Sequence, residues 1–114
     1  MSAVQSCRDQ ESIVWHPVCA AARVTESDPV AVKIGNKRIA VYRLPDGELS
    51  ALDDVCPHEF ALLSKGFVED GEIECPLHQA RFEIRSGKCH GPLADRDLHK
   101  FPVKVEGGDV YVAI

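Results

Sequence analysis

The 114-residue sequence has no excess of basic residues and no long apolar run. Its 13 Lys and Arg residues stand against 18 Asp and Glu residues, which gives a formal net charge of −5 at pH 7. Nucleic-acid-binding proteins usually carry a basic excess, so the charge argues against that class and is compatible with a partner that has a basic docking patch. No segment approaches the ~20 apolar residues of a membrane-spanning helix. The first residues lack the features of a secretory signal, and we expect a cytoplasmic protein.

Cysteine is the unusual residue in this composition, with five in the chain. An odd number of cysteines leaves at least one without an intramolecular disulfide partner, and cytoplasmic thiols stay reduced. In that compartment a cysteine-rich pattern indicates a metal site or catalysis before it indicates disulfides.

Helical periodicity is also missing, because no window of helical period exceeds one or two turns. Strand and turn signals instead recur about every 8–12 residues, which is typical of an all-β sandwich or barrel. We expect antiparallel strands over residues 30–34, 38–44 and 48–53, and a hairpin of residues 101–106 with 110–114.

The organisation along the chain is expected to be a flexible tail over residues 1–12 and one domain over residues 13–114. Residues 54–95 differ from the rest of that domain, because they hold three of the five cysteines and three of the five histidines. Turn signals such as Asp70-Gly71 and Ser86-Gly87 are frequent there. We therefore expect a small inserted subdomain with little hydrophobic core of its own.

Two short segments carry the candidate metal ligands. They are Cys56-Pro57-His58 and Cys75-Pro76-Leu77-His78, separated by sixteen residues between His58 and Cys75. Each segment supplies one thiolate and one imidazole from a tight turn, and the proline stiffens each turn. Two such loops brought together make a site with four ligands.

Two metals suit a site of two thiolates and two imidazoles. One is a tetrahedral zinc ion, and the other is a [2Fe–2S] cluster in which two histidines replace two cysteines on one iron. Zinc fingers group their cysteines together and their histidines together, whereas each segment here mixes one of each. The spacing therefore favours the iron–sulfur cluster.

From Trp15 to its end the sequence resembles the Rieske-type [2Fe–2S] ferredoxins that serve bacterial aromatic-ring-hydroxylating dioxygenases. The motifs that carry the resemblance are Leu52-Asp53-Asp54-Val55-Cys56-Pro57-His58, Gly66-Phe67, Asp70-Gly71, Glu74-Cys75-Pro76-Leu77-His78-Gln79-Ala80-Arg81-Phe82, Arg85-Ser86-Gly87-Lys88 and the last hairpin.

The resemblance implies an antiparallel β-sandwich with a cluster-binding subdomain over residues 54–95. It also implies that Cys56 and Cys75 bind the inner iron of one [2Fe–2S] cluster, and that His58 and His78 bind the outer iron near the docking tip. The carrier would be a monomer that passes single electrons from an NAD(P)H-dependent flavin reductase to a terminal oxygenase. It would have no catalytic site of its own.

Four positions depart from the high-potential respiratory relatives. Ala61 and Leu77 stand where those proteins carry a disulfide, and Ala80 and Phe82 stand where a serine and a tyrosine donate hydrogen bonds to the cluster. Missing donors make reduction harder, so we expect a low reduction potential and no respiratory role.

Several other residues receive a prediction of their own. Trp15 is expected to anchor the core, Cys19 to be a small buried residue, and Gln79 and Arg81 are candidates for partner contact. His90 lies next to Gly91-Pro92, where relatives have a third loop over the cluster, and a tuning role is open for it. No metal role is assigned to Cys7, Cys89, His16 or His99.

Two other functions remain open from the sequence. The first is the small Rieske-fold subunit of an assimilatory nitrite reductase, and the second is a zinc-stabilised interaction module. The colour of the purified protein would separate zinc from iron and sulfide.

Overall fold

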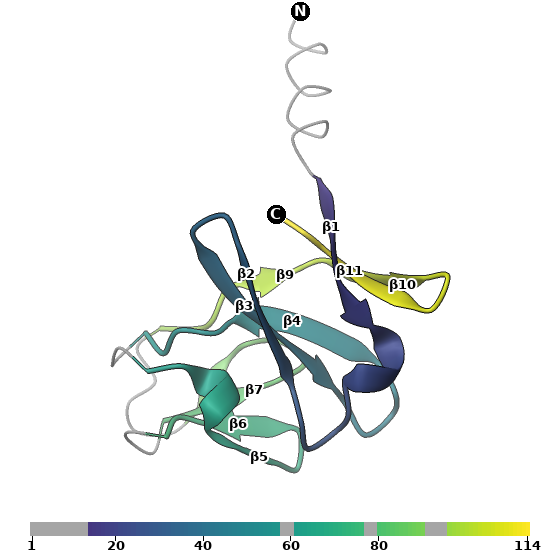
Figure 1. Ribbon diagram of the computed structural model, residues 1–114. Helices are drawn as coiled ribbons and strands as arrows, with labels where there is room; N and C mark the ends of the chain where they lie inside the picture. The colour runs from purple at the N-terminus through teal and green to yellow at the C-terminus, as the bar shows by residue number, and fades with distance from the viewer. Residues whose placement is uncertain (1–13, 58–60, 77–79, 91–95) are drawn as a thin grey trace, which may run out of the picture.

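The structure is a computed structural model, and it describes residues 14–57, 61–76, 80–90 and 96–114. Within these ranges the chain forms eleven strands in three antiparallel sheets and two short 3-10 helices (Figure 1). No helix there is long and apolar enough to cross a membrane. The predicted all-β antiparallel architecture is confirmed, and the predicted tail over residues 1–12 lies outside the described residues.

The three sheets combine strands that lie far apart in the sequence. The first sheet contains, in spatial order, β1 (Trp15–Ala20), β11 (Asp109–Ala113) and β10 (Val103–Glu106). The middle sheet contains β2 (Val30–Ile34), β3 (Lys37–Arg43), β4 (Leu49–Asp53) and β9 (Lys100–Phe101). The third sheet contains β5 (Phe67–Glu69), β6 (Glu72–Glu74), β7 (Arg81–Glu83) and β8 (Cys89–His90). The 3-10 helices are η1 (Ala21–Arg23) and η2 (Leu63–Lys65).

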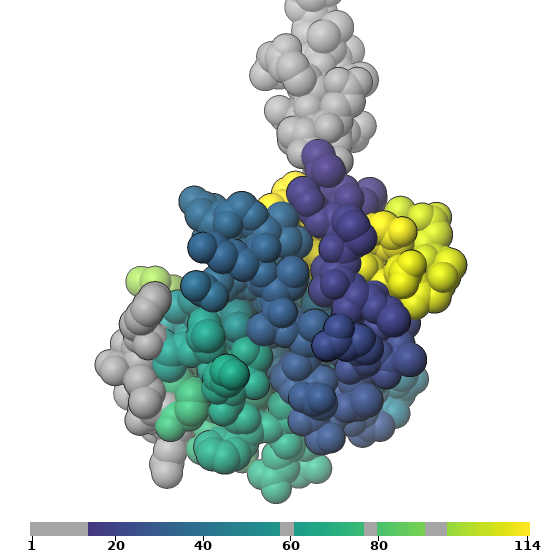
Figure 2. Space-filling view, in the orientation of Figure 1, coloured from purple at the N-terminus to yellow at the C-terminus, as the bar shows by residue number. Residues whose placement is uncertain are grey.

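The middle sheet is buried on both faces, because the other two sheets pack against it from opposite sides. Successive side chains of a strand point to opposite faces. On β3, Ile39 and Val41 belong to one core with residues of the first sheet, and Ala40 and Tyr42 belong to a second core with residues of the third sheet. The apolar character of both faces of residues 38–44 is therefore explained by two cores. In the space-filling view the teal and green third sheet lies below the purple and yellow first sheet (Figure 2).

The third sheet packs more apolar surface than the sequence predicts. We expected residues 54–95 to hold little core, but Ile73 and Phe82 are fully buried and Ile84 is nearly so. Three-residue strands are too short to show a clear alternation, so their apolar face has no recognisable period in the sequence. The prediction of a subdomain with little core was wrong.

The predicted last strand over residues 101–106 is divided between two sheets. Phe101 pairs with Ala51 in the middle sheet, and Val103 begins β10 of the first sheet. Pro102 stands at the division, where its missing N–H group removes a ladder hydrogen bond. Phe101 is consequently buried, whereas Val105 is 50% exposed.

Trp15 is a surface residue, and the prediction that it anchors the core was wrong. Its side chain is 38% exposed at the start of β1, and the Lys104 Nζ lies 4.5 Å from the centre of its ring. A lysine over a tryptophan face is a favourable cation–π arrangement at an exposed site. The large apolar side chains that fill the cores come instead mainly from β3, β4, β11, η2 and the third sheet with the residue that follows β7.

The Tyr42 hydroxyl is a buried polar group without a hydrogen-bond partner among the described residues. Burial, and then the nearby Asp54 carboxylate, raise the pKa of Tyr42. Since an unsatisfied buried hydroxyl is costly, we expect Tyr42→Phe to raise the free energy of unfolding by about 1 kcal/mol. Denaturant unfolding of this variant beside Tyr111→Phe, which alters a half-buried tyrosine, checks the prediction. A less stable Tyr42→Phe would contradict it and indicate a bound water on the hydroxyl.

Candidate metal centre

The first predicted ligand loop is closed at its base by backbone hydrogen bonds. It follows β4, and the Cys56 N–H group donates to the Ala61 carbonyl over 2.9 Å. One step further out, the Leu63 N–H group donates to the Asp54 carbonyl over 2.6 Å. The loop therefore leaves and re-enters the fold at one place, with Cys56 at its first position.

The second predicted ligand loop connects β6 with β7 and is closed in the same way. The Cys75 N–H group donates to the Ala80 carbonyl over 3.0 Å, and Glu74 pairs with Arg81 just outside that bond. Each loop thus begins with a cysteine whose N–H group bonds the residue five positions later. Each intervening segment has four residues, and one of these is a predicted histidine ligand.

The matched closure has a signal in the sequence that ligand spacing alone does not show. The two loops read Cys-Pro-His-Glu-Phe-Ala over residues 56–61 and Cys-Pro-Leu-His-Gln-Ala over residues 75–80. Both are Cys-Pro-x-x-x-Ala, so the alanine that accepts the closing bond is a shared feature of the two sequences. Its importance depends on a backbone bond, which residue type alone does not reveal.

The structure brings the two predicted cysteine ligands into one apolar core. Cys56 is 3% exposed and Cys75 is 2% exposed, and both belong to the core between the middle and third sheets. Two sulfur atoms at equivalent positions of two similar loops, shielded from water, fit a shared iron or zinc centre. The donor set in the described residues therefore agrees with the predicted group.

The other two predicted ligands, His58 and His78, lie outside the described residues, as do Leu77, Gln79 and Gly91-Pro92. The positions that lack hydroxyl donors are described. Ala80 is 2% exposed, Phe82 is fully buried, and both pack in the same core as the two cysteines. Their side chains therefore lie on the buried side of the sheet, where a hydroxyl would face the cysteine-containing core.

A buried carboxylate holds the first loop to the rest of the fold. The N–H group of Ser64 donates to Asp54 Oδ1 over 2.7 Å, and the Ser64 hydroxyl donates to Asp54 Oδ2 over 2.9 Å. Burial raises the pKa of Asp54, and the hydrogen bonds from Ser64 oppose that increase. The Asp54–Ser64 pair fixes η2 against the residue that precedes the loop.

Arg81, a candidate for partner contact, is engaged within the chain. Its guanidinium contacts one carboxylate oxygen each of Glu74, Glu72 and Glu69, at 3.1, 3.3 and 3.3 Å. The side chain of Glu72 also lies 2.7 Å from Nδ1 of His90. The network therefore links the strands on both sides of the second loop with the strand that leads toward Gly91.

The remaining cysteines lie in strands. Cys19 is half-buried in β1 and packs against the core of the first sheet. Cys89 is buried in β8 opposite Phe82, and its N–H group donates to Asp97 Oδ1 over 2.9 Å. The position of Cys19 in a strand, packed against a core, is close to the prediction of a small buried residue, although it is only half-buried. The absence of a metal role for Cys19 and Cys89 stays a prediction, and Cys89 shares the core of Cys56 and Cys75.

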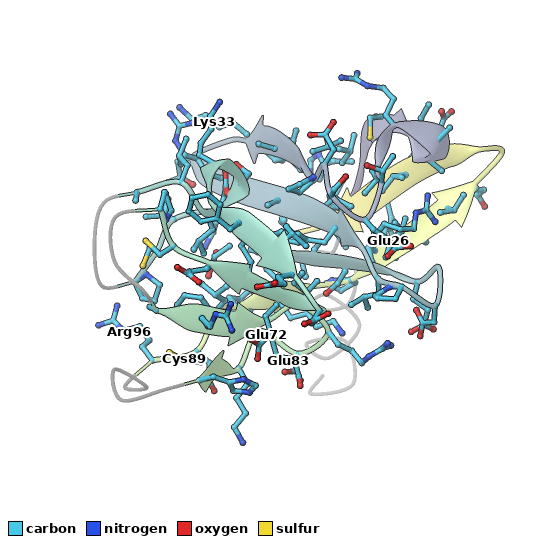
Figure 3. All side chains as sticks on the ribbon, turned by 90° about the horizontal axis from the view of Figure 1, so that it is seen from below. Glu26, Lys33, Glu72, Glu83, Cys89 and Arg96 are labelled. Atoms are coloured by element: carbon cyan, nitrogen blue, oxygen red, sulfur yellow. The ribbon has the colours of Figure 1, made fainter. Side chains whose placement is uncertain are left out.

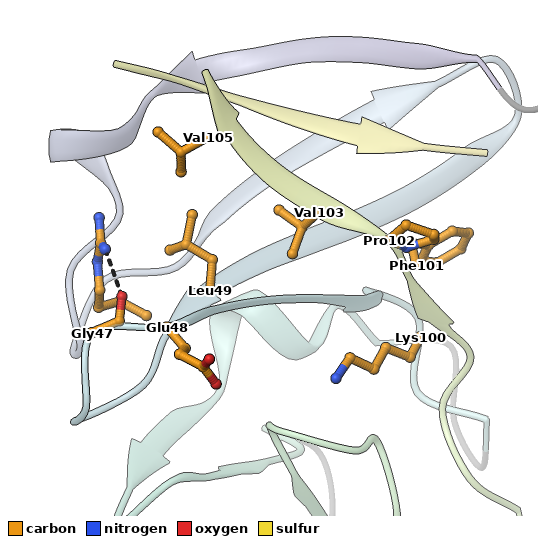
Figure 4. Close-up of a pocket in the computed structure, with 9 residues that line it drawn as sticks. Gly47, Glu48, Leu49, Lys100, Phe101, Pro102, Val103 and Val105 are labelled. Carbon is orange, nitrogen blue, oxygen red and sulfur yellow. Dashed lines mark hydrogen bonds between the residues drawn. The ribbon is translucent and has the colours of Figure 1, made fainter. Parts of the chain in front are cut away.

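A groove of about 480 Å³ lies between β4 and β10, apart from the cysteine loops (Figure 4). Aliphatic side chains of Leu49, Val103 and Val105 form much of its lining. At one end, the Arg43 guanidinium donates to the carbonyls of Gly47, Val24 and Ala21. None of the predicted ligands contributes to this groove, so the candidate chemistry stays with the two loops.

Comparison with known proteins agrees with this arrangement. A family model described as the Rieske [2Fe-2S] domain matches residues 14–102. The anthranilate 1,2-dioxygenase ferredoxin subunit of Burkholderia cepacia is 44% identical to this chain over 102 residues. The match covers 88% of this chain and 92% of that protein.

Two solved structures share the fold over nearly the whole chain. The complex of reduced oxygenase and oxidised ferredoxin in carbazole 1,9a-dioxygenase contains a chain that is 36% identical, with a TM-score of 0.80, and the match covers 88% of this chain and 93% of that one. A protein from Mycobacterium tuberculosis, described as a candidate small subunit of NADH-dependent nitrite reductase, is 26% identical with a TM-score of 0.79. That match covers 90% of this chain and 96% of that one.

Proposed function

The chain belongs to the family of Rieske [2Fe-2S] domains, and from this premise we propose that it is the electron-carrier ferredoxin of a bacterial aromatic-ring-hydroxylating dioxygenase system. The observation that carries the proposal is the pair of identically closed loops, each starting with a cysteine buried in one shared core. The similarity to a dioxygenase ferredoxin subunit, which extends over most of both chains, supports the same function.

We assign Cys56 and Cys75 to the inner iron of one [2Fe–2S] cluster, and His58 and His78 to the outer iron. When bound, the cluster would accept and release one electron at a time. The role of this chain would be to hold the cluster, to exclude water from its cysteine side through the shared core, and to present its histidine side to partners.

The proposed partners are an NAD(P)H-dependent flavin reductase, which supplies the electrons, and a terminal oxygenase, which receives them. A solved complex of an oxygenase with a ferredoxin of this fold supports the oxygenase as a partner. The chain would carry electrons without a substrate of its own, and its net charge of −5 suits docking on basic surfaces.

The second candidate is the small subunit of an assimilatory nitrite reductase. The similarity to the Mycobacterium tuberculosis protein supports this candidate, although the 26% identity is lower than the 44% identity to the dioxygenase ferredoxin subunit. A zinc module is less well supported, because family membership favours an iron–sulfur cluster.

Reconstitution tests the proposal directly. We expect purified chain to contain iron and sulfide and to show a Rieske-type electron paramagnetic resonance spectrum after reduction. Added to a flavin reductase and an aromatic-ring oxygenase, it should restore NAD(P)H-dependent product formation. Restoration of nitrite reduction by a nitrite reductase large subunit, without any effect on the oxygenase, would favour the second candidate.

The buried positions of Ala80 and Phe82 predict how the reduction potential can be changed. Ala80→Ser and Phe82→Tyr should each direct a hydroxyl toward the cluster and stabilise its reduced state. A hydrogen bond to a charged group is worth about 1.5–3 kcal/mol, but only the difference between the redox states counts. Since about 1.4 kcal/mol corresponds to about 59 mV for one electron, we expect upward shifts of several tens of millivolts, larger in the double variant.

Voltammetry of both single variants and the double variant checks this expectation. Ala113→Ser is the control, because it adds a hydroxyl at a buried alanine of β11 in the first sheet. A double variant with an intact cluster and an unmoved or lower potential would show that missing hydroxyls do not set the potential here.

A further inference from the structure

The outward face of the third sheet carries an unusual arrangement of charge. Its inward face is the buried one, with Ile73 and Phe82 as cross-strand partners. On the outward face the cross-strand partners form two rows, Phe67–Glu74–Arg81–His90 beside the second loop and Glu69–Glu72–Glu83 one step further away. Figure 3 shows Glu72 and Glu83 close together on adjacent strands.

Like charges directly opposite one another destabilise a sheet, so the second row is unfavourable by itself. In the described part of this face, four glutamates face one arginine. Arg81 compensates for much of this repulsion, because its Nε, Nη1 and Nη2 atoms contact Glu74, Glu72 and Glu69 respectively. The hydrogen bond with Glu74 contributes most to raising the pKa of Arg81, so the guanidinium stays charged.

The position of this network relative to the second loop is the decisive feature. Glu74 directly precedes Cys75, and Arg81 directly follows Ala80, which accepts the closing bond of the loop. The Arg81–Glu74 contact therefore lies across the base of the loop, beside that backbone bond. The first loop is held differently, by the neutral hydroxyl of half-buried Ser64 on the buried Asp54 carboxylate.

A positive charge beside a redox centre stabilises its reduced state, and a negative charge disfavours that state. Arg81 together with its three carboxylate partners carries a net charge of −2, and without the guanidinium the charge would be −3. We infer that Arg81 is a positioning residue for the second ligand loop and that its charge raises the reduction potential of the cluster. This inference rests on the proposed function, since it requires the cluster to be bound by these loops.

Two substitutions of opposite charge separate electrostatics from loosening of the loop. Arg81→Gln removes the positive charge, and we expect a lower reduction potential. Glu74→Gln removes a negative charge but keeps an oxygen that accepts from Arg81 Nε, and we expect a higher potential. A purely structural role would not move the two potentials in opposite directions. Both shifts should shrink at high salt, because the network is partly exposed.

Arg81→Lys and Arg85→Gln are the matched controls. Lysine keeps the charge, so the reduction potential of Arg81→Lys should be close to that of the parent. Lysine cannot contact three carboxylates in one plane, so the cluster should be lost faster on heating than in the parent. Arg85 lies beyond the other end of β7 and bonds Asp46 and Glu48 at 2.8 and 2.7 Å. Its replacement removes the same charge from a comparable network with two carboxylates, and the potential should stay unchanged.

Film voltammetry, with the electron paramagnetic resonance spectrum as a check on the cluster, measures all four variants. Unchanged potentials in Arg81→Gln and Glu74→Gln, or an equal shift in Arg85→Gln, would overturn the inference and leave the proposed function standing. If Arg81→Gln fails to hold a cluster, the two other variants of this network still test the effect of charge. Glu74→Gln should raise the potential, and Arg81→Lys, which keeps the charge, should retain that of the parent. Absence of a cluster from the parent chain would instead overturn the proposed function itself, and this inference with it.

Discussion

Replacing His58 or His78 by alanine is expected to prevent assembly of a normal [2Fe–2S] cluster. Each histidine is assigned as one of only two protein ligands on the outer iron, and alanine offers no atom that can replace it. Metal binding is coupled to folding of the site, so loss of one ligand weakens the whole centre. Iron and sulfide content, together with the electron paramagnetic resonance spectrum of the reduced protein, measures the effect.

His99→Ala and Cys19→Ala are matched controls for this experiment. His99 is exposed and its ring stacks edge-on against Phe101, and Cys19 is half-buried in β1. Both lie outside the two loops, so both variants should retain full cluster content. Full content and an unchanged spectrum in His58→Ala or His78→Ala would refute the ligand assignment.

Gly66→Ala is expected to disrupt the cluster-binding region. We expect it to lower the free energy of unfolding by about 3 kcal/mol or more, which is the range of severe core changes. A Cβ atom at this position would lie 1.9 Å from the Glu74 carbonyl oxygen and 3.1 Å from that of Leu63. Both are backbone atoms, so a simple rotation of a side chain cannot relieve the overlap. Because Glu74 directly precedes Cys75, relief by moving β6 would displace the second loop. Unfolding in denaturant and retention of the cluster on heating both measure the effect.

Gly35→Ala provides a matched control for the same substitution. Gly35 has a φ of +62°, and a Cβ atom there would meet no other atom within 4 Å. Alanine at this position should lower the free energy of unfolding by about 1–2 kcal/mol, because a residue with a Cβ atom disfavours the left-handed conformation. The cluster should be retained. Equal losses in the two variants would show that close approach to Glu74 is not what requires glycine at position 66.

Short-range features of this protein were predictable from its sequence. Residues 30–34 show the alternation expected of a strand, and the Asp70-Gly71 turn has positive φ at both residues. The candidate ligands are equally local, because each thiolate and imidazole pair lies within four residues of a proline-stiffened turn. Such patterns depend on neighbours along the chain, and those neighbours are visible in the sequence.

Other features depend on which strands meet, and only the tertiary structure decided them. Burial of both faces of β3, and of the short strands of the third sheet, follows from three sheets stacked around two cores. Trp15 is exposed because β1 is an edge strand of the first sheet, and Lys104 covers its ring there. The apolar character of tryptophan alone predicted a place in the core.

The contacts that hold the two cysteine loops in place were also decided only by the tertiary structure. The closing bonds of the two loops, the contact of Gly66 with Glu74, and the three carboxylates around Arg81 join residues that are up to 12 positions apart. Cys56 and Cys75 share a core across a wider separation still. Composition and spacing identified the atoms suited to hold a metal. The pairing of strands decided which groups surround those atoms, because a side chain's environment depends on distance in space and not on distance along the chain.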